Sequence, residues 1–375
     1  MAGNGRKRPS TGSLTQALCD DLRGRILNGE YAGASFLPSE SALCDTHAVS
    51  RITVRRALKR LADGGWIASR PGKGWEVLWN RPDEPVQARR VVGLVYRNGP
   101  DAEVIFGAAR KRFDEEGWAT RFFPGYISDE EVASSLPLEQ LRGILCYSGV
   151  PLSRSFLDRA QEHDVRVVCI GHEVHQSYDC VSVDNMFSFE LLAAHLIKEG
   201  HRHIAYLSAD VLTERDPGFV RRESGYRAAM RNHGLRPAIF YLPQNVFDGV
   251  GDESRVLEWL SDLREQGRPP TAIICTTCGL ANGLLGLLAR EGLRLPEDIL
   301  VTGFAPMYSD EMLREHGLDR YLALEDPDEQ MGEVGANRLL SRLAGDTSRA
   351  HLTLLRPKFV VYRRTRQWAA TTIST

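Results

Sequence analysis

Basic side chains crowd residues 51–60 and could contact the phosphates and guanine edges of DNA: Arg51, Arg55, Arg56, Lys59 and Arg60. The apolar residues of the same segment follow the i, i+3, i+4, i+7 spacing of a helix with one buried face: Val54, Ala57, Leu58 and Leu61. Ser50 stands where an N-cap should stand, because its hydroxyl can accept from the Thr53 amide. A capped helix with an apolar back and a basic front suits a DNA major groove, although a charged helix face can also be merely solvated.

The neighbouring segments favour the DNA-binding interpretation. A first helix is predicted over residues 14–28, where leucine and isoleucine recur every four residues. Pro38 sets a second helix start, and residues 39–45 are long enough for about two turns. Two glycines end the basic helix, and residues 66–78 are predicted to form two β-runs around a basic, glycine-rich tip. Three helices and such a hairpin make a winged helix-turn-helix.

Residues 14–78 closely resemble the GntR-type DNA-binding domain. The matching segments are residues 22–26, 29–31, 37–40, 50–55, 57–58, 61, 64 and 72–74. The resemblance implies that Arg51 and Arg55 read bases and that Gly72, at the wing tip, approaches the minor groove. The full predicted DNA-binding set is Ser39, Ser50, Arg51, Thr53, Arg55, Arg56, Gly72 and Lys73. Some family members carry a DNA-contacting arginine just after the Pro-Ser-Glu segment, and Ser41 replaces it here.

Length, composition and charge indicate that this segment is the N-terminal domain of a multidomain protein. The chain has 375 residues, 42% hydrophobic and 26% charged, which is ordinary for a soluble globular protein of more than one domain. Residues 1–80 carry a formal charge of +5 and the remainder −7, which fits a DNA-binding head on a domain that does not bind DNA. No apolar run approaches the ~20 residues of a membrane-spanning helix, and the basic N-terminus has no apolar segment behind it to form a secretory signal.

The cysteine content indicates the cellular compartment of the protein. Seven cysteines, an odd number, without a secretory signal indicate a reducing cytoplasm. Cys275 and Cys278 form a lone CxxC pair, which could be redox-active or half of a zinc site. No second pair or suitable histidine completes four ligands, so we expect a structural role and no bound metal.

From residue 90 the pattern changes to short apolar runs that alternate with helix-length amphipathic segments. The predicted strands cover residues 91–96, 143–147, 165–170, 203–207, 239–242, 271–275 and 299–304, and the predicted helices between them include 101–116, 188–199, 222–232 and 279–291. Repeated βα units build parallel sheets with helices on both faces, and about 280 residues predict two lobes. The overall fold class is therefore α/β, with domains at residues 12–79 and 90–368 joined by a linker at 80–89.

Ligands of open α/β sheets bind beyond the carboxyl ends of the strands. The residues that follow the predicted strands are therefore candidates for a binding site: Arg97, Asn98, Tyr147, Ser148, His172, Glu173, Asp184, Asn185, Asp210, Cys278 and Ala305. Asp184 and Asn185 could equally be a structural turn pair. His201 and His203 are expected near a helix C-terminus, in a surface role rather than as metal ligands.

Residues 90–368 resemble the LacI/GalR-type effector-binding region, which is itself similar to periplasmic sugar-binding proteins. The matching segments are residues 181–185, 200–205, 222–226, 270–274, 295–299, 303–304 and 331–336. The resemblance implies a ligand bound between two lobes, with Arg222 directed toward ligand oxygens. The effector-binding residues predicted in this way are Arg97, Tyr147, His172, Asp184, Arg222 and Cys278. Two usual carboxylates are absent, because Cys278 and Ala305 stand in their places, so a typical hexose fits less well than a different or more apolar ligand.

The function predicted from these features is that of a ligand-responsive transcription regulator, most simply a repressor that a small molecule, such as a sugar or sugar derivative, releases from its operator. One recognition helix per half-site implies a homodimer on two-fold symmetric double-stranded DNA. An alternative is a regulator whose second domain only dimerises. An enzyme fused to a DNA-binding head is the third hypothesis, but Lys111, Lys198 and Lys358 lack the context of a Schiff-base lysine, and no hydrolase, nucleotide or zinc-protease motif appears. We predict no catalytic residue and no cofactor.

Overall fold

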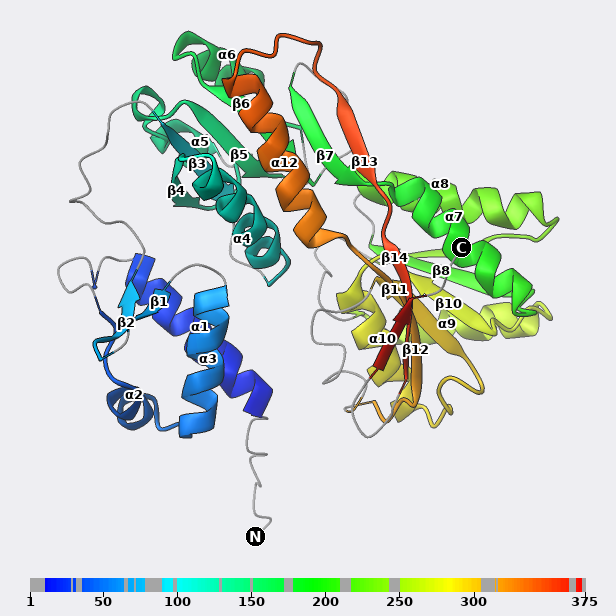
Figure 1. The fold of residues 1–375 in the computed structure, drawn as a ribbon. Helices are drawn as coiled ribbons and strands as arrows, with labels where there is room; N and C mark the ends of the chain where they lie inside the picture. The colour runs from blue at the N-terminus through cyan, green and yellow to red at the C-terminus, as the bar shows by residue number, and fades with distance from the viewer. Residues whose placement is uncertain are drawn as a thin grey trace. The chain divides into compact units, whose positions relative to one another are not determined.

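The computed structural model describes residues 11–27, 30–31, 36–63, 67–70, 72–77, 90–96, 100–127, 130–148, 151–171, 178–209, 217–242, 250–304, 314, 316–363 and 369–372 (Figure 1). The chain divides into two compact units. The first unit combines Met1–Tyr147, Ser153–Val168 and Asp328–Thr347, and the second combines Ser148–Leu152, Cys169–Pro327 and Ser348–Thr375. The predicted linker at residues 80–89 lies outside the described residues.

The N-terminal part of the first unit is the predicted winged helix-turn-helix. Helices α1 (Thr11–Leu27), α2 (Glu40–His47) and α3 (Arg51–Asp63) precede a wing of two antiparallel strands, β1 (Ile67–Arg70) and β2 (Gly74–Val77). The expected apolar stripes meet in one core, whose buried members include Leu18, Leu22, Ile26, Leu43, Val54, Ala57, Leu58 and Leu61. This packing fixes which face of α3 remains at the surface.

A six-stranded sheet has the order β13-β7-β6-β5-β3-β4. Its strands are β3 (Val91–Tyr96), β4 (Ala119–Pro124), β5 (Gly143–Tyr147), β6 (Arg166–Ile170), β7 (Asp179–Val183) and β13 (Leu352–Leu355). The helices of the first unit that follow the wing are α4 (Pro100–Glu115), α5 (Glu130–Ser135), the short 3₁₀ helix η1 (Leu138–Gln140), α6 (Arg154–Glu162) and α12 (Asp328–Leu343). Helix α12 packs closely on α4. The separation is so small that a Cβ at Gly332 would collide with the carbonyl oxygen of Ile105.

The second unit holds a seven-stranded sheet of order β15-β14-β12-β11-β10-β8-β9. Its strands are β8 (Ile204–Ala209), β9 (Ala238–Leu242), β10 (Ala272–Cys275), β11 (Leu300–Phe304), β12 (Arg320–Glu325), β14 (Lys358–Arg363) and β15 (Ala369–Thr372). The helices are α7 (Asn185–Lys198), α8 (Pro217–Asn232), α9 (Glu253–Glu265) and α10 (Cys278–Arg290). Apolar side chains alternate along β8, with Leu207 in the cluster under α10 and Tyr206 in the cluster under α7 and α8, so both faces of this sheet are covered.

The seven predicted strands are all present within two residues of their expected limits. The predicted α/β class is confirmed. Neighbouring strands among β8, β10, β11 and β12 pair in parallel, as expected. The sheet edge differs, because β14 runs antiparallel to both β12 and β15. Among the described helices, none is both long and apolar enough to cross a membrane.

Candidate functional site

The N-terminus of α3 is capped as its sequence predicts. The Thr53 amide donates to the Ser50 hydroxyl at 3.2 Å, and the two hydroxyl oxygens of Ser50 and Thr53 lie 2.9 Å apart. Thr53 is buried, so its side chain completes the cap instead of facing outward. Ser39 caps α2 in the same way, since its hydroxyl accepts from the Ala42 amide at 3.2 Å. Helix α2 therefore begins at Glu40, and each capping hydroxyl accepts from an amide in the first turn of its own helix.

The opposite side of α3 carries the predicted basic surface. Its residues Arg51, Arg55, Arg56 and Lys59 are all exposed, and Ile52 lies among them. Arg55 is held from the side: its Nε donates to Oε2 of Glu40 at 2.9 Å. The first residue of α2 thus orients a predicted base-reading arginine. Sequence reasoning missed this role of Glu40, because the two residues come from different helices.

The wing presents its basic tip in a conformation that requires glycine. Gly72 and Gly74 have φ of 73° and 101°, in the left-handed region that favours glycine. The Lys73 amide donates to the Arg70 carbonyl at 3.0 Å, which closes the turn and leaves the Lys73 side chain exposed. Arg70 pairs with the buried carboxylate of Glu76 at the base of the wing. Lys73 is therefore an exposed cation at the wing tip, between two glycines of positive φ.

A second polar site lies in the second unit at the carboxyl ends of β10 and β11. The Arg222 side chain on α8 reaches it and is held at two points: its Nε donates to Oδ1 of Asn185 at 2.7 Å, and its Nη1 donates to the Thr276 carbonyl at 2.6 Å. Its Cζ also lies 4.3 Å from the centre of the Phe304 ring, in cation–π contact. The guanidinium group is thus fixed in one orientation.

Each group that holds Arg222 is itself held. The Asn185 amide donates to the Val183 carbonyl at 3.2 Å, and Asn185 is buried. Asp184 caps α7, because its Oδ1 accepts from the Phe187 amide at 3.1 Å. The structure therefore gives Asp184 a capping contact, whereas Asn185 carries the link to the arginine. The Thr276 hydroxyl is buried and donates to the Leu207 carbonyl at 3.2 Å.

The charge of Arg222 has no counter-ion within the described part of the chain. None of the described carboxylates lies within ion-pair distance of its guanidinium group, and its Nη2 donates no hydrogen bond to a described residue. Burial raises the pKa of the nearby Tyr206 hydroxyl well above its usual value, even though the charge of Arg222 acts in the opposite direction. Tyr206 therefore stays neutral.

The other predicted effector residues that the structure describes lie on separate elements. Tyr147 ends β5 in the first unit, and its ring centre lies 6.3 Å from that of Tyr126. Cys278 is the exposed first residue of α10, whereas Cys275 is fully buried, and burial raises the pKa of the Cys275 thiol. No cluster of potential metal ligands occurs among the residues that the structure describes. The remaining candidates lie outside the described residues: Arg97, Asn98, His172, Glu173, Asp210 and Ala305.

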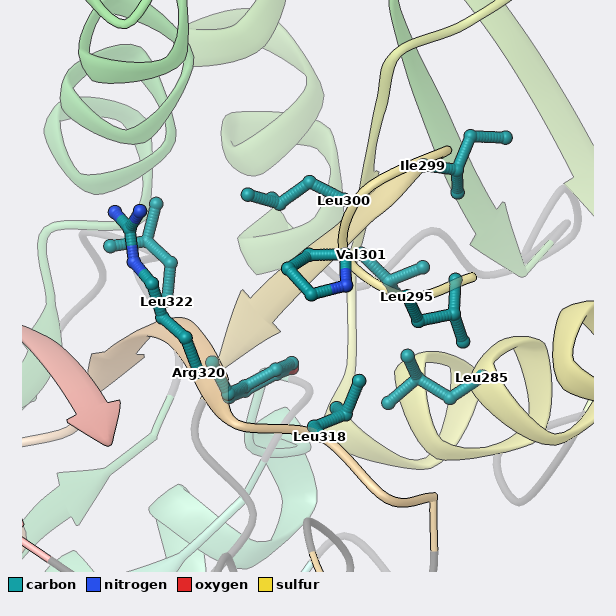
Figure 2. A pocket seen from close by; sticks show the side chains of 10 residues that line it. Leu285, Leu295, Ile299, Leu300, Val301, Leu318, Arg320 and Leu322 are labelled. Atoms are coloured by element: carbon teal, nitrogen blue, oxygen red, sulfur yellow. The ribbon is translucent and has the colours of Figure 1, made fainter. Parts of the chain in front are cut away.

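A small pocket lies at the other end of the same sheet, near the amino ends of β11 and β12 (Figure 2). Its lining is mainly aliphatic and includes Leu285, Leu295 and Leu318. Arg320 is the charged residue of the lining, and its guanidinium group is bound to Glu199 at 2.8 Å. Two polar atoms of the lining, Nε of Arg320 and the hydroxyl of Tyr321, are buried without a hydrogen-bond partner among the described residues, so the pocket is not purely aliphatic.

The predicted surface histidines also lie at this amino end. Nδ1 of His201 lies 2.8 Å from the Thr271 hydroxyl, and Nδ1 of His203 lies 3.3 Å from the Pro269 carbonyl oxygen. His201 follows the C-terminus of α7, as its sequence position predicted. Both contacts join the start of β8 to the segment before β10.

Comparison with known proteins extends these observations. Residues 14–77 match the family described as bacterial regulatory proteins, gntR family, and residues 193–365 match the periplasmic binding protein-like domain. The arabinose metabolism transcriptional repressor of Geobacillus stearothermophilus is 25% identical over 93% of this chain and 97% of its own length. The probable HTH-type transcriptional repressor ExuR of Bacillus subtilis is 25% identical over 63% of this chain and 68% of its own length.

Solved structures show the same architecture for the second part of the chain. A LacI transcriptional regulator from a Rhodococcus species covers 72% of this chain and 96% of its own, with 23% identity and a TM-score of 0.58. The resemblances to both families are thereby confirmed, each for its own part of the sequence. The chain is a DNA-binding transcription regulator in which a GntR-type winged helix is joined to a periplasmic-binding-protein-like domain.

Proposed function

We propose that this regulator is a repressor that reads its operator with Arg51 and Arg55 and leaves it when a sugar or sugar derivative binds at Arg222. The observation that carries the DNA part is the exposed basic face of a helix whose N-terminus is capped and whose back is fully buried. Arginine forks bind guanine through O6 and N7, and each such contact discriminates by about 1–3 kcal/mol. Arg56, Lys59 and Lys73 would chiefly bind phosphates and add salt dependence.

The effector part rests on the geometry of Arg222. Its Nε and Nη1 are engaged by protein oxygens, which fixes the direction of Nη2, a group that has no hydrogen-bond partner among the described residues. A fixed cation at the carboxyl ends of parallel strands is suited to the hydroxyl or carboxylate oxygens of a small polar molecule. The relative named for arabinose metabolism makes sugars and sugar acids the first class to test.

The coupling between the two sites follows from symmetry. A two-fold operator needs two winged helices at a fixed separation, so we propose a homodimer held by the second domain. Effector binding would shift the dimer toward a form whose two α3 helices no longer match the half-site spacing. The proposed regulator is not an enzyme and acts in the cytoplasm, where its DNA lies.

A thermal-shift screen of the full chain against sugars, sugar acids, sugar phosphates and nucleosides tests the effector site. A ligand at about 100 times its dissociation constant should stabilise the protein by ~2.7 kcal/mol. We expect Arg222→Ala to abolish the shift and Arg231→Ala, an exposed arginine of the same helix, to retain it. A shift that survives Arg222→Ala would reject this site, and the absence of any shift would favour the alternative in which the second domain only dimerises.

A mobility-shift assay with selected operator DNA tests the reading residues. We expect Arg51→Ala and Arg55→Ala each to abolish specific retention without loss of folding, whereas Lys111→Ala, an exposed lysine on α4, should bind as the wild type does. Wild-type affinity in both arginine variants would reject the assignment of base contacts to α3.

A further inference from the structure

Ile52 occupies an unexpected position for a large apolar residue. Its side chain is 63% exposed, more than any other exposed large hydrophobic residue among those the structure describes. The residue before it, Arg51, and the exposed residues one turn later, Arg55 and Arg56, are all cationic. Ile52 therefore lies within the basic surface of α3 and not at its margin.

Helix geometry places Ile52 at the centre of that surface. At about 100° per residue, Ile52 projects roughly opposite to Ala57 and Leu61, which are buried. Arg55 and Arg56 lie on either side of this direction, and Lys59 lies about two turns along it. A side chain at the middle of the face that enters the major groove points at the floor of the groove, whereas side chains at the flanks can reach the phosphates.

Local stability does not account for isoleucine at this position. A β-branched residue is a weaker helix former than the straight-chain residues that suit exposed helix positions. The buried core of the domain gains nothing from Ile52, because its side chain faces away from it. An apolar group on this face is explained by an apolar partner, and the base-pair edges of the major groove offer one such group, the C5-methyl of thymine.

We propose that Ile52 determines part of the operator sequence by packing on the C5-methyl group of a thymine in each half-site. The inference rests on the proposed reading of DNA by α3 and adds to it a specificity that neither arginine supplies. Arg51 and Arg55 would select guanine through hydrogen bonds, and Ile52 would select an adjacent thymine through desolvation of its methyl group.

The test uses the full chain and an operator obtained by selection from random duplexes. Each thymine of a half-site is replaced in turn by deoxyuridine, which removes the methyl group and keeps base pairing. We expect one position at which this replacement weakens wild-type binding by roughly fourfold, the value of one buried methyl-sized group. The same replacement should leave the affinity of Ile52→Ala unchanged, since its contact is already lost.

Matched variants separate this outcome from general damage. Lys59→Ala should bind all operators more weakly but keep the full penalty for deoxyuridine, and thermal unfolding should show that Ile52→Ala folds as the wild type does. An operator whose thymine methyl groups affect the wild type and Ile52→Ala equally, or not at all, would overturn the inference and leave the arginine contacts standing. Failure to select any sequence would overturn the proposed reading of DNA, and this inference with it.

Discussion

The Nε of Arg55 on α3 lies 2.9 Å from Oε2 of Glu40, the first residue of α2. The pair joins the two helices of the helix-turn-helix at its exposed side, where 65% of the Arg55 side chain remains accessible. An exposed ion pair of this kind adds little to stability. Its consequence is directional, because engagement of Nε leaves the two Nη groups of Arg55 as the outward fork that a guanine needs.

Replacement of Glu40 should therefore lower specificity more than stability. Glu40→Ala frees the Arg55 side chain and also removes a negative charge from a surface that approaches phosphates. We expect affinity for the operator to fall, affinity for unrelated DNA to rise, and their ratio to decrease by roughly tenfold, a part of the 1–3 kcal/mol of a bidentate contact. Binding titrations at one salt concentration measure both affinities. Ser41→Ala, at the exposed neighbouring position, is the control, and an unchanged ratio in Glu40→Ala would contradict a positioning role.

Loss of the α3 cap should act through stability first. Ser50→Ala removes the acceptor of the Thr53 amide and also the partner of the Thr53 hydroxyl, so we expect a loss of about 1 kcal/mol in the free energy of unfolding. Ser50→Asp should retain the cap but place a negative charge beside the DNA, and so keep stability while weakening binding. Urea unfolding and a DNA titration of both variants distinguish the two effects. Equal stability of Ser50→Ala and the wild type would show that the cap contributes nothing.

The pH dependence of stability should include a contribution from His195. Burial lowers the pKa of His195, and the nearby Glu199 acts in the opposite direction without cancelling it; burial lowers the pKa of His201 as well. The folded chain thus binds these protons less readily than the unfolded chain, whose histidines titrate near about pH 6.5. The contribution of these histidines to the free energy of unfolding is therefore fully present above that pH and is lost as the pH falls below it. Urea unfolding between about pH 7 and pH 5 should show a shallower decline for His195→Gln, and identical declines would contradict the assignment.

The sequence pattern was sufficient for the winged helix because its signals are local. An N-cap, an apolar face and a glycine turn each involve residues within a few positions of one another, and the structure reproduces the Ser50 cap and the burial of Val54 and Leu58. The Glu40 contact could not be predicted in this way, because it depends on the angle at which α2 and α3 pack. The antiparallel strands β14 and β15 were missed for another reason: no helix separates them, and β15 is Ala-Ala-Thr-Thr, which carries no strong apolar signal.

The surroundings of Arg222 show the same limit. A resemblance named the arginine, and Asn185 was a candidate through its position after a strand. The carbonyl of Thr276 carries no sequence signal, since a main-chain oxygen can belong to any residue. Phe304 lies in a segment that carries the second resemblance, but its contact with Arg222 could not be foreseen, since a phenylalanine at a strand end is ordinarily part of the core. Four separate segments meet at this guanidinium group, and only the fold brings them together.

Close packing of α7 on α8 explains the glycine three residues after Arg222. A Cβ at Gly225 would collide with the Met186 carbonyl oxygen of α7, so only glycine permits this separation of the helices. The next residue, Tyr226, anchors α8 to the sheet, because its hydroxyl donates to the Ile204 carbonyl at 2.7 Å. Arg222 keeps its contacts with Asn185 only while α8 stays at this distance from α7.

Gly225→Ala should therefore destabilise the protein, although alanine is ordinarily the better helix former. We expect a cost of about 1–3 kcal/mol, the usual range for overpacking, and loss of any effector-induced thermal shift, because α8 must move away from Asn185. Gly234→Ala is the control: its φ of 66° imposes backbone strain, but no atom lies within 4 Å of the added Cβ. That variant should be moderately destabilised and still respond to effector. Measured free energies of unfolding that rank Gly225→Ala at or above the wild type would show that the two helices can separate without cost, and Arg222 would then need another explanation for its fixed position.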